Sequence, residues 1–566
     1  MKQFYNTFKL NNYITQKDKE KIKEAYTPLY LKTKKNILSV FFKEKRKFLK
    51  DYLNINKLVE HNNNKYINQK KEEYNSLLKN IKGYQLDEEQ TQCVLNEEDT
   101  SLVIAGAGSG KTLTIIAKIR YLIETQYIEE DEILCISFTR ESSNKLKEDL
   151  KNYYNYNIDV CTFHKLALNI LKDNDYEFII SSDDTLSYIV NEFYDSLILD
   201  YPNIKNLVTE YFFGKKNKLY SDIKHNQLNN FKKIIITFIN LLKANVNNPE
   251  MINSYLKKVN GKNYLLLLNI IIIYNLYTLE LNSQNEIDFD DLIYLSTQYV
   301  DNYGINKKYK YIIIDEYQDT SLIRINLIKA IIKKIKCKLM VVGDDFQSIY
   351  KFSGCNINTF FNFQDYFPYS KIFYIRNNYR NTQEIVDIAG KFIMKNKNQL
   401  SKQIKAHKSL DKPIKIVYYQ NQANTFDSLL KYMINQNQKN ILILGRNNND
   451  LRKIIEDENS LKQYNPNIKY LTVHKSKGLE EENIIIINLE NDIMGFPSKL
   501  EEHEIMNLIY DNKESIKYEE ERRLFYVALT RSKNYVYLLV NKNRPSIFVK
   551  EIINDYPNKI EIISIK

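Results

Sequence analysis

Short apolar runs recur in both halves of the chain, and helical spacing of apolar positions follows most of them. These runs have the length of strands that are buried on both faces of a sheet. Their alternation with helices is typical of βαβ units and predicts an α/β fold with parallel sheets. The runs lie at residues 102–104, 311–314 and the start of 337–350, and then at 415–419, 440–445, 484–489 and 535–540.

The residues between the early and the later apolar runs of the first half read differently. Residues 169–285 are largely helical in pattern, and FKKIIITFINLLK (231–243) mixes apolar and basic positions. Residues 264–279 are strongly apolar, but they are interrupted by Asn269 and Asn275. The run is shorter than the roughly 20 residues that span a bilayer. We therefore expect a buried helix and no membrane partner.

Composition narrows the class of protein. The chain has 566 residues, which suggests three or four domains, and 43% of them are hydrophobic and 27% charged, as in soluble globular proteins. Its five cysteines form no Cys-x-x-Cys pair, which argues against zinc sites, iron–sulfur sites and a disulfide framework. The N-terminus lacks an apolar signal core. A cytoplasmic location fits these features best.

The positive charge is concentrated at the N-terminus. Residues 1–83 hold 20 Lys and Arg but only eight Asp and Glu, so this region accounts for the whole net charge of +12. Such a region could lie along a phosphate backbone, or it could be a solvated helical face. The sequence leaves both interpretations open.

A glycine-rich loop joins the first apolar run to a helical pattern. Residues 102–112 read LVIAGAGSGKT, the strand–loop–helix context of a phosphate-binding loop rather than of a chance Gly-rich turn. Backbone N–H groups at the start of the helix can cradle phosphate oxygens. Lys111 can reach the β- and γ-phosphates of ATP, and the hydroxyl of Thr112 can hold Mg²⁺. The predicted cradle consists of Ala107, Gly108, Ser109 and Gly110.

Two acidic residues end the apolar run at 311–314. Asp315 suits Mg²⁺ coordination, and Glu316 is placed to orient or deprotonate the attacking water. Solvated acids that cap a strand are the alternative, but the phosphate loop upstream favours the catalytic interpretation. Gln347 follows the next strand and could contact the γ-phosphate, although most loop glutamines are merely solvated.

Ten motifs follow one another along the chain. They are LDEEQTQCV (86–94), AGAGSGKT (105–112), SFTRESSNKLKEDL (137–150), TFHKLAL (162–168), IDFDDLI (287–293), DEYQDT (315–320), GDDFQSIYKFSG (343–354), NNYRNTQEI (377–385), TVHKSKGLE (472–480) and EERRLFYVALTRSK (520–533). This ordered set, within about residues 60–550, resembles the UvrD/Rep-type superfamily 1 DNA helicases, and within them the helicase IV group. One motif departs from the family pattern, since Ser142 and Ser143 lie where alanines are usual.

The resemblance implies roles for further residues. Gln90 maps to the residue that reads adenine, Tyr379 to the residue that stacks on the base, and Glu480 to a residue near the ribose. Arg380 and Arg531 map to arginine fingers, which stabilise charge on the γ-phosphate. The residues that would contact single-stranded DNA are Thr162, Phe163, His164, Tyr350, Phe352, Thr472 and His474, although core packing is an alternative for both phenylalanines.

The resemblance also implies two RecA-like domains with ATP between them. Only 92 positions separate Arg380 from Thr472, so a second accessory subdomain must be absent or reduced. We expect a basic helical region (1–83), a first RecA-like domain in two parts (84–168 and 286–355), a helical accessory subdomain between them (169–285), and a second RecA-like domain (356–566).

The expected function is that of an ATP-dependent 3′–5′ DNA helicase or translocase. It would use ATP and Mg²⁺, act on single-stranded DNA and single-strand/duplex junctions, and serve DNA repair or recombination. One alternative is a motor subunit for a nuclease or repair partner, including in phage defence. Another is a nucleic-acid-binding module in which ATP acts only as a switch. A P-loop small-molecule kinase does not fit the length or the later motifs.

Overall fold

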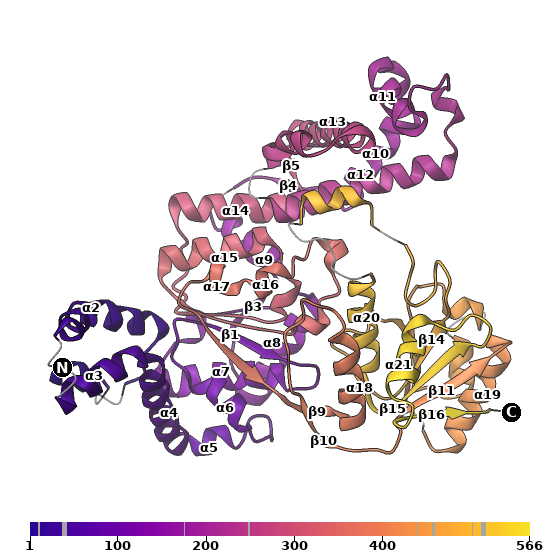
Figure 1. Cartoon of the computed structure of the whole chain (residues 1–566). Coiled ribbons are helices and arrows are strands. Elements are labelled where there is room, and N and C mark those ends of the chain that lie inside the picture. The colour runs from indigo at the N-terminus through magenta and orange to yellow at the C-terminus, as the bar shows by residue number, and fades with distance from the viewer. Residues whose placement is uncertain are drawn as a thin grey trace.

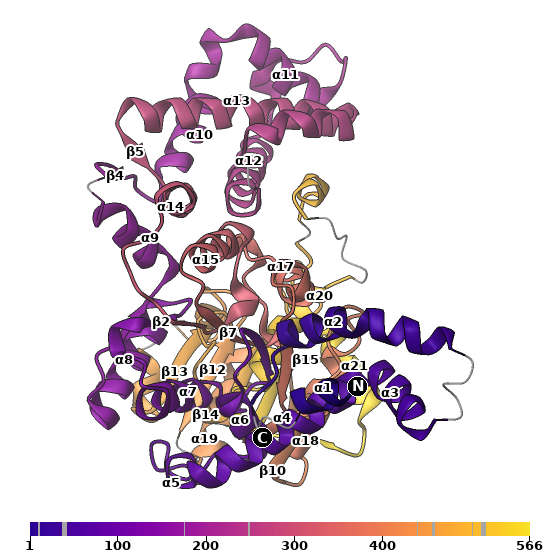
Figure 2. The same cartoon turned by 90° about the vertical axis from the view of Figure 1, so that its left-hand side faces the viewer.

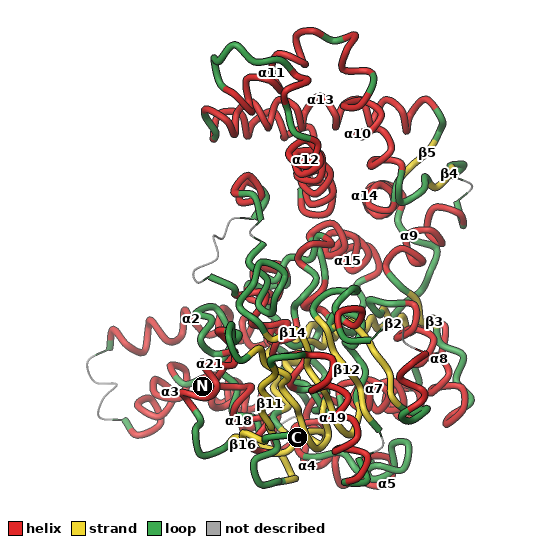
Figure 3. The backbone as a smooth tube through the Cα atoms, turned by 90° about the vertical axis from the view of Figure 1, so that its right-hand side faces the viewer, coloured by secondary structure: helices red, strands yellow, loops and turns green. Residues whose placement is uncertain are grey.

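Two parallel β-sheets, a helical subdomain and an N-terminal helical region make up the chain (Figure 1). The computed structural model describes residues 1–8, 12–36, 42–174, 176–246, 249–438, 440–455, 459–500, 502–510 and 517–565. Figure 3 shows the strands of both sheets on one side of the molecule and the long accessory helices on the other. The predicted α/β class with two parallel sheets is confirmed.

The first sheet has the order β3-β2-β6-β7-β1-β8, and all of its strand pairs are parallel. Helices α6, α7 and α8 cover one face, and α9, α14, α15, α16 and α17 cover the other. The strands are β1 (Thr100–Ala105), β2 (Ile133–Ile136), β3 (Asp159–Cys161), β6 (Tyr311–Ile314), β7 (Lys338–Gly343) and β8 (Lys371–Ile375). The helices are α6 (Glu88–Leu95), α7 (Lys111–Gln126), α8 (Arg140–Tyr154), α9 (Phe163–Lys172), α14 (Phe289–Tyr303), α15 (Leu322–Ile335), α16 (Asn358–Phe361) and α17 (Phe363–Tyr366).

Strand β8 corrects one predicted boundary. The first domain was expected to end at residue 355, but β8 pairs with β1 from Ser101↔Lys371 to Ala105↔Ile375. The helices α16 and α17 also pack in the core of the first sheet. The sequence did not show this because IFYI (372–375) follows residue 355 closely and shares the composition of the later strands.

The second sheet has the order β13-β12-β14-β15-β11-β16 and is also parallel throughout. Its core is formed with α18, α20 and α21 on one face and α19 on the other. A separate two-stranded ribbon, β9 (Asn377–Thr382) and β10 (Lys405–Lys408), lies between the sheets in sequence. The remaining elements are β11 (Ile414–Tyr419), β12 (Ile441–Gly445), β13 (Ile468–Thr472), β14 (Glu481–Leu489), β15 (Ser532–Asn541), β16 (Ile560–Ile563), α18 (Gln383–Ile393), α19 (Gln422–Asn435), α20 (Glu519–Leu529) and α21 (Ile547–Asp555).

The helical subdomain is inserted between the short strands β4 (Ile179–Ile180) and β5 (Glu286–Ile287), which pair with each other. It contains α10 (Thr185–Asp195), α11 (Pro202–Phe213), α12 (His225–Asn245) and α13 (Gly261–Ser283). By length and composition alone, α13 could cross a membrane, but it packs with α10, α11 and α12 around one apolar core. Asn269, which interrupts its apolar run, is fully buried and accepts a hydrogen bond from the hydroxyl of Tyr194 at 3.1 Å.

The N-terminal region is helical, as predicted, and has a small core of its own. Phe4, Phe48 and Tyr52 pack there beside residues of α4. Tyr13 ties the region to the first domain, because its hydroxyl donates to a carboxylate oxygen of Glu98 at 3.0 Å. The helices are α1 (Lys2–Thr7), α2 (Gln16–Lys35), α3 (Lys43–Leu53), α4 (Ile55–Glu73) and α5 (Asn75–Leu78). Figure 2 shows α1, α2 and α3 gathered at one side of the molecule.

Candidate nucleotide and DNA sites

The phosphate loop connects β1 to α7 at the carboxyl edge of the first sheet. Gly108 and Gly110 have φ angles of +69° and +80°, which glycine adopts without steric cost. A Cβ on Gly108 would lie 2.6 Å from the Cβ of Arg380, and one on Gly110 would lie 2.7 Å from Nε2 of Gln90. Both positions therefore require glycine. The N–H groups of the first turn of α7 face an anion site at the positive end of the helix.

The two predicted acids lie at the same edge, because β6 and β1 both flank β7 in the parallel sheet. Glu316 holds a left-handed backbone with φ +53°, an uncommon conformation for a residue other than glycine. Its Oε1 lies 3.4 Å from Nζ of Lys111, and its Oε2 accepts a hydrogen bond of 2.6 Å from Gln318. The structure thus joins the phosphate loop to the predicted catalytic acid.

The two acids differ in protonation. Burial raises the pKa of Asp315, and the neighbouring charge of Glu316 raises it further. Burial also acts to raise the pKa of Glu316, but the ammonium groups of Lys111 and Lys477 outweigh it and hold that pKa below its usual value. Glu316 is therefore ionised at neutral pH and can accept a proton from water.

Magnesium needs oxygen ligands, and only a few of them must come from protein when phosphates supply the rest. Thr112 stands in the first turn of α7, and Asp315 directly follows β6 at the same edge of the sheet. Their hydroxyl and carboxylate are the oxygen donors that the sequence predicts for a Mg²⁺ ion shared with a nucleotide. In the part of the chain that the structure describes, no group of three or more His, Cys, Asp or Glu could hold a metal without a nucleotide.

Arg531 reaches the site from the second domain. Its Nη2 donates to Oε1 of Gln347 at 3.0 Å, and its Nε and Nη1 donate to backbone carbonyls of Val527 and Leu479. Burial, and then the nearby charge of Arg380, lowers the pKa of Arg531 to about 9, so the group stays charged at neutral pH. The structure therefore brings these two predicted residues, from opposite domains, into direct contact.

Strand β9 crosses directly over the phosphate loop. The N–H of Tyr379 donates to the carbonyl of Gly108 at 2.8 Å, and the amide of Asn378 donates to the carbonyl of Ala107 at 2.7 Å. Arg380, the next residue along β9, donates from Nε to a carboxylate oxygen of Glu480 at 2.6 Å. The predicted arginine finger and the predicted ribose-side residue are thus already paired.

Gln90 and Tyr379 frame the predicted base site. The amide of Gln90 accepts from the N–H of Asp87 at 3.0 Å and donates to the carbonyl of Ser109 at 2.9 Å, so it links the cap of α6 to the phosphate loop. The hydroxyl of Tyr379 donates to the side chain of Asp87 at 2.7 Å. The ring of Tyr379 is 52% exposed and stacks on His407 with 5.1 Å between centroids.

Two lysines were missed as site residues. Lys477 lies within the quoted motif 472–480; its ammonium group pairs with Asp319 and donates to the carbonyl of Gln347 at 2.6 Å. Lys402 belongs to no motif, yet its side chain is 3% exposed and pairs with Asp344 and Asp345. A motif position could have flagged Lys477, but no local signal distinguishes Lys402 from the many other lysines.

The predicted DNA residues fall into two groups. Tyr350, Phe352 and His474 cluster: the hydroxyl of Tyr350 donates to the carbonyl of His474 at 3.0 Å, and the Phe352 and His474 rings lie 5.4 Å apart. Phe352 is 55% exposed and available for stacking. Phe163 is instead buried in the core of the first sheet, in agreement with the packing alternative.

The other three predicted DNA residues are Thr162, His164 and Thr472. Thr162 caps α9, its hydroxyl accepting from the N–H of Lys165 at 3.3 Å. The His164 ring packs edge-on against Phe289 at 5.2 Å. Thr472 ends β13 and lines the same cavity as Phe352 and His474.

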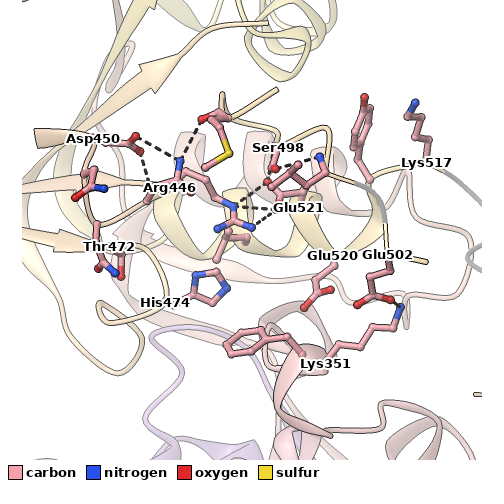
Figure 4. Close-up of a pocket in the computed structure, with 18 of the residues that line it drawn as sticks. Lys351, Arg446, Asp450, Thr472, His474, Ser498, Glu502, Lys517, Glu520 and Glu521 are labelled. Atoms are coloured by element: carbon pink, nitrogen blue, oxygen red, sulfur yellow. Dashed lines mark hydrogen bonds and ion pairs between the residues drawn. The ribbon is translucent and has the colours of Figure 1, made fainter. Parts of the chain in front are cut away.

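That cavity has a volume of about 1110 Å³ and lies between the two domains (Figure 4). Arg446 crosses it and is held by Glu521 through contacts of 2.7 and 2.9 Å, while the N–H of Ser498 donates to the same carboxylate at 2.9 Å. Phe352 and His474 also line the cavity, and in Figure 4 Lys351 lies at the side of it where Glu502 is found. The cavity thus combines aromatic groups with cations that are paired to carboxylates of its own lining, Arg446 to Glu521 and Lys351 to Glu502. Cationic and aromatic groups are the chemistry that holds single-stranded nucleic acid.

Two parallel sheets, a phosphate loop with an ionised acid, and an arginine supplied by the facing domain define a P-loop nucleotide hydrolase with two RecA-like domains. Residues 86–368, half of the chain, match the family model for the UvrD/REP helicase N-terminal domain. Residues 454–543 match the model for the UvrD-like helicase C-terminal domain. The chain belongs to the UvrD/REP family of ATP-dependent DNA helicases.

Curated relatives support this assignment. The chain is 27% identical over 499 residues to DNA helicase IV of Escherichia coli, a match that covers 85% of this chain and 72% of that protein. It is 30% identical to the probable DNA helicase II homolog of Mycoplasma capricolum, over 64% of this chain and 49% of that protein. It is 31% identical to ATP-dependent DNA helicase Rep of Buchnera aphidicola, over 60% and 50%. The chain thus spans about half the length of the latter two relatives.

Proposed function

We propose that this protein hydrolyses ATP to move 3′–5′ along single-stranded DNA and to unwind duplex at junctions, in DNA repair or recombination. The observation that carries the proposal is the bond between Arg531 of the second domain and Gln347 of the first, next to the acid Glu316. Hydrolysis at such a site depends on how the two domains close, because one domain supplies the acid and the other the arginine. The DNA cavity is lined by both domains, so closure also moves its walls.

Each predicted site residue has its own proposed role in ATP hydrolysis or in DNA binding. Backbone N–H groups of the phosphate loop and Lys111 bind the phosphates, Glu316 accepts the proton of the attacking water, and Arg531 and Arg380 stabilise the charge on the γ-phosphoryl group. A Mg²⁺ ion held by Thr112 and Asp315 would neutralise phosphate charge. Phe352 and His474 would stack on bases without reading their sequence.

The test is steady-state ATP hydrolysis by the full chain, with and without single-stranded DNA. We expect strong stimulation by DNA and its loss in Glu316→Gln, while Glu72→Gln, an exposed position in α4, leaves the rate unchanged. Duplexes with a 3′ or a 5′ single-stranded tail then test polarity. Hydrolysis that ignores DNA would contradict a DNA-coupled motor and favour an ATP switch or a missing partner subunit.

Repair or recombination as the process, and a nuclease or repair protein as a partner, rest on family resemblance. The match to DNA helicase IV, which runs along 85% of this chain, supports helicase activity but does not choose between a free motor and a motor subunit. Unwinding of a 3′-tailed duplex by the purified chain alone would support the free motor. Unwinding that appears only after a partner is added would favour the motor-subunit alternative.

A further inference from the structure

One segment of the second domain leaves that domain and packs on the accessory helices. Residues 502–510, which stand between β14 and α20 in the sequence and include the 3₁₀ helix η11 (Glu504–Leu508), lie beside α12 in Figure 1. Ile505 and Met506 are 1% and 4% exposed, and Ile509 and Tyr510 are also buried. All four belong to the apolar core that α12 and α13 form. The predicted second domain (356–566) therefore contributes part of the accessory core.

Polar contacts fix this segment at two more points. The amide of Asn263, at the start of α13, donates to a carboxylate oxygen of Glu504 at 2.6 Å. Glu502 pairs with Lys351 of the first domain at 2.6 Å, and the hydroxyl of Tyr510 donates to the carbonyl of Lys351 at 3.2 Å. One segment thus joins the second domain to the accessory subdomain and to the first domain.

The candidate DNA cavity lies beneath this segment. Its lining includes Glu502, His503 and Asn507 of this segment, Phe352 of the first domain and His474 of the second. In Figure 4, the pair between Lys351 and Glu502 lies at the edge of the cavity away from Thr472. A strand that stacks on Phe352 and His474 would therefore lie against residues of this segment as well.

The docked position is the stable one. Undocking would expose four large apolar side chains to water, which the hydrophobic effect opposes. The docking residues lie outside the nucleotide site, so the contact does not depend on the arginines that close over ATP. This contact joins the second domain to the accessory helices, and it is separate from the ribbon β9–β10, which borders the phosphate loop.

We propose that residues 502–510 form a strap that closes the DNA cavity, so that the protein encircles the single strand along which it moves. This inference rests on the proposed function, because it takes the cavity at Phe352 and His474 as the DNA path. The strap restrains the strand topologically, in addition to the contacts that bind it. Encirclement predicts slow release from DNA without a need for tighter binding at any single base.

A cross-link tests the topology. Glu504 is exposed, Asn263 is partly exposed, and the two side chains are hydrogen-bonded to each other, so a disulfide between Asn263→Cys and Glu504→Cys would close a covalent ring running from residue 263 through both sheets to residue 504. The five native cysteines are buried. The full-length double variant is bound to closed-circular or to linear single-stranded DNA of equal length, oxidised, and challenged with high salt.

We expect the oxidised protein to stay on circular DNA, to slide off linear DNA, and to leave the circle when the disulfide is reduced. Oxidation before DNA is added should prevent stable binding to the circle. Each single-cysteine variant is a control and should release both DNAs alike. If the oxidised double variant also leaves both DNAs equally fast, the strand does not pass beneath the strap and the proposal is overturned.

A second variant tests the consequence without a cross-link. Ile505→Asp should undock the strap and speed dissociation from single-stranded DNA several-fold, while the rate of ATP hydrolysis at saturating DNA stays the same. Ile493→Asp, 59% exposed in the same connection, is the matched control. Unchanged dissociation in Ile505→Asp contradicts the strap. A wild-type protein whose hydrolysis ignores DNA contradicts the proposed function instead, so the two failures are distinguishable.

Discussion

At the scale of single residues, the nucleotide site depends on charges that are buried and paired. Arg531 is 1% exposed, and Glu316 is ionised although its side chain is only 20% exposed. A buried charge is tolerated only where partners compensate for lost hydration. Here Lys111 compensates Glu316, while the amide of Gln347 and two backbone carbonyls satisfy the guanidinium group. Substitutions at this scale should therefore affect catalysis strongly.

We expect Arg531→Lys to lower kcat for ATP hydrolysis by about 100- to 1000-fold, with a small change in KM. Lysine keeps a positive charge but lacks the planar fork that bonds Gln347 and two carbonyls at once. Steady-state kinetics at saturating DNA measures the effect. Arg544→Lys is the matched control, because Arg544 is exposed in the same domain. Equal kinetics for both variants would argue against a role of Arg531 at the phosphate.

Two histidines should make folding sensitive to acid. Burial, and then the neighbouring cations Arg324 and Arg446 respectively, lower the pKa of His164 and of His474 to about 4. The unfolded chain binds these protons near pH 6.5, whereas the folded chain binds them only near pH 4. Stability from the neutral rings is therefore fully present above pH 6.5 and is lost as pH falls toward 4.

The free energy of unfolding, measured with urea between pH 4 and 7.5, should fall more steeply in the wild type than in His164→Asn with His474→Asn. His61→Asn is the control, since His61 is exposed in α4. If the free energy of unfolding of the double variant falls with pH as steeply as that of the wild type, groups other than these two histidines cause the loss of stability in acid.

At the scale of elements, the ribbon β9–β10 and its flanking residues lock the second domain to the first. Strand β9 bonds the phosphate loop through its backbone, and β10 lies beside it in parallel register. Lys402, just before β10, reaches Asp344 and Asp345 just after β7. The connection between the sheets is thus held by the same residues that border the nucleotide site.

Lys402→Met should destabilise the protein by about 3–5 kcal/mol, because it leaves two buried carboxylates without their counter-charge. Urea unfolding at neutral pH measures the change. Lys397→Met, an exposed position five residues earlier, is the control and should lie within ~0.5 kcal/mol of the wild type. A similar small effect for Lys402→Met would mean that the acids are satisfied in another way.

At the scale of the whole molecule, charge is distributed unevenly. The basic N-terminal region is attached to the first domain through the hydroxyl of Tyr13 and the N–H of Gln16, which both donate to the carboxylate of Glu98. This fixed attachment gives its lysines a defined position relative to the first sheet. The structure describes exposed lysines along α2, which could contact a phosphate backbone or only solvent.

We expect replacement of Lys32, Lys34 and Lys35 by Gln to weaken DNA binding and to reduce the slope of log K against log [salt] by about two to three. The rate of ATP hydrolysis at saturating DNA should not change. Replacement of three exposed lysines of the second domain is the control; these are Lys431, Lys542 and Lys559. An unaltered slope in the α2 variant would identify this face as merely solvated.

Taken by itself, the sequence determined the classes of structure and the chemistry that local patterns encode. The apolar runs predicted strands in both sheets, and the spacing around Gly108 and Lys111 predicted the phosphate loop. Both depend on neighbouring residues only. The resemblance then assigned Gln90, Tyr379, Arg380, Glu480 and Arg531, and the structure places these residues around that loop or in contact with residues that border it.

Tertiary structure alone decided which distant segments meet. Strand β8 joined the first sheet rather than the second, Lys402 became an interdomain counter-ion, and residues 502–510 entered the core of the accessory helices. Parallel strands pair with partners far away in sequence. The residues next to a lysine or a short apolar run do not show which distant segment it will contact. These contacts follow from packing of the whole chain, because burial of apolar surface does not depend on sequence distance.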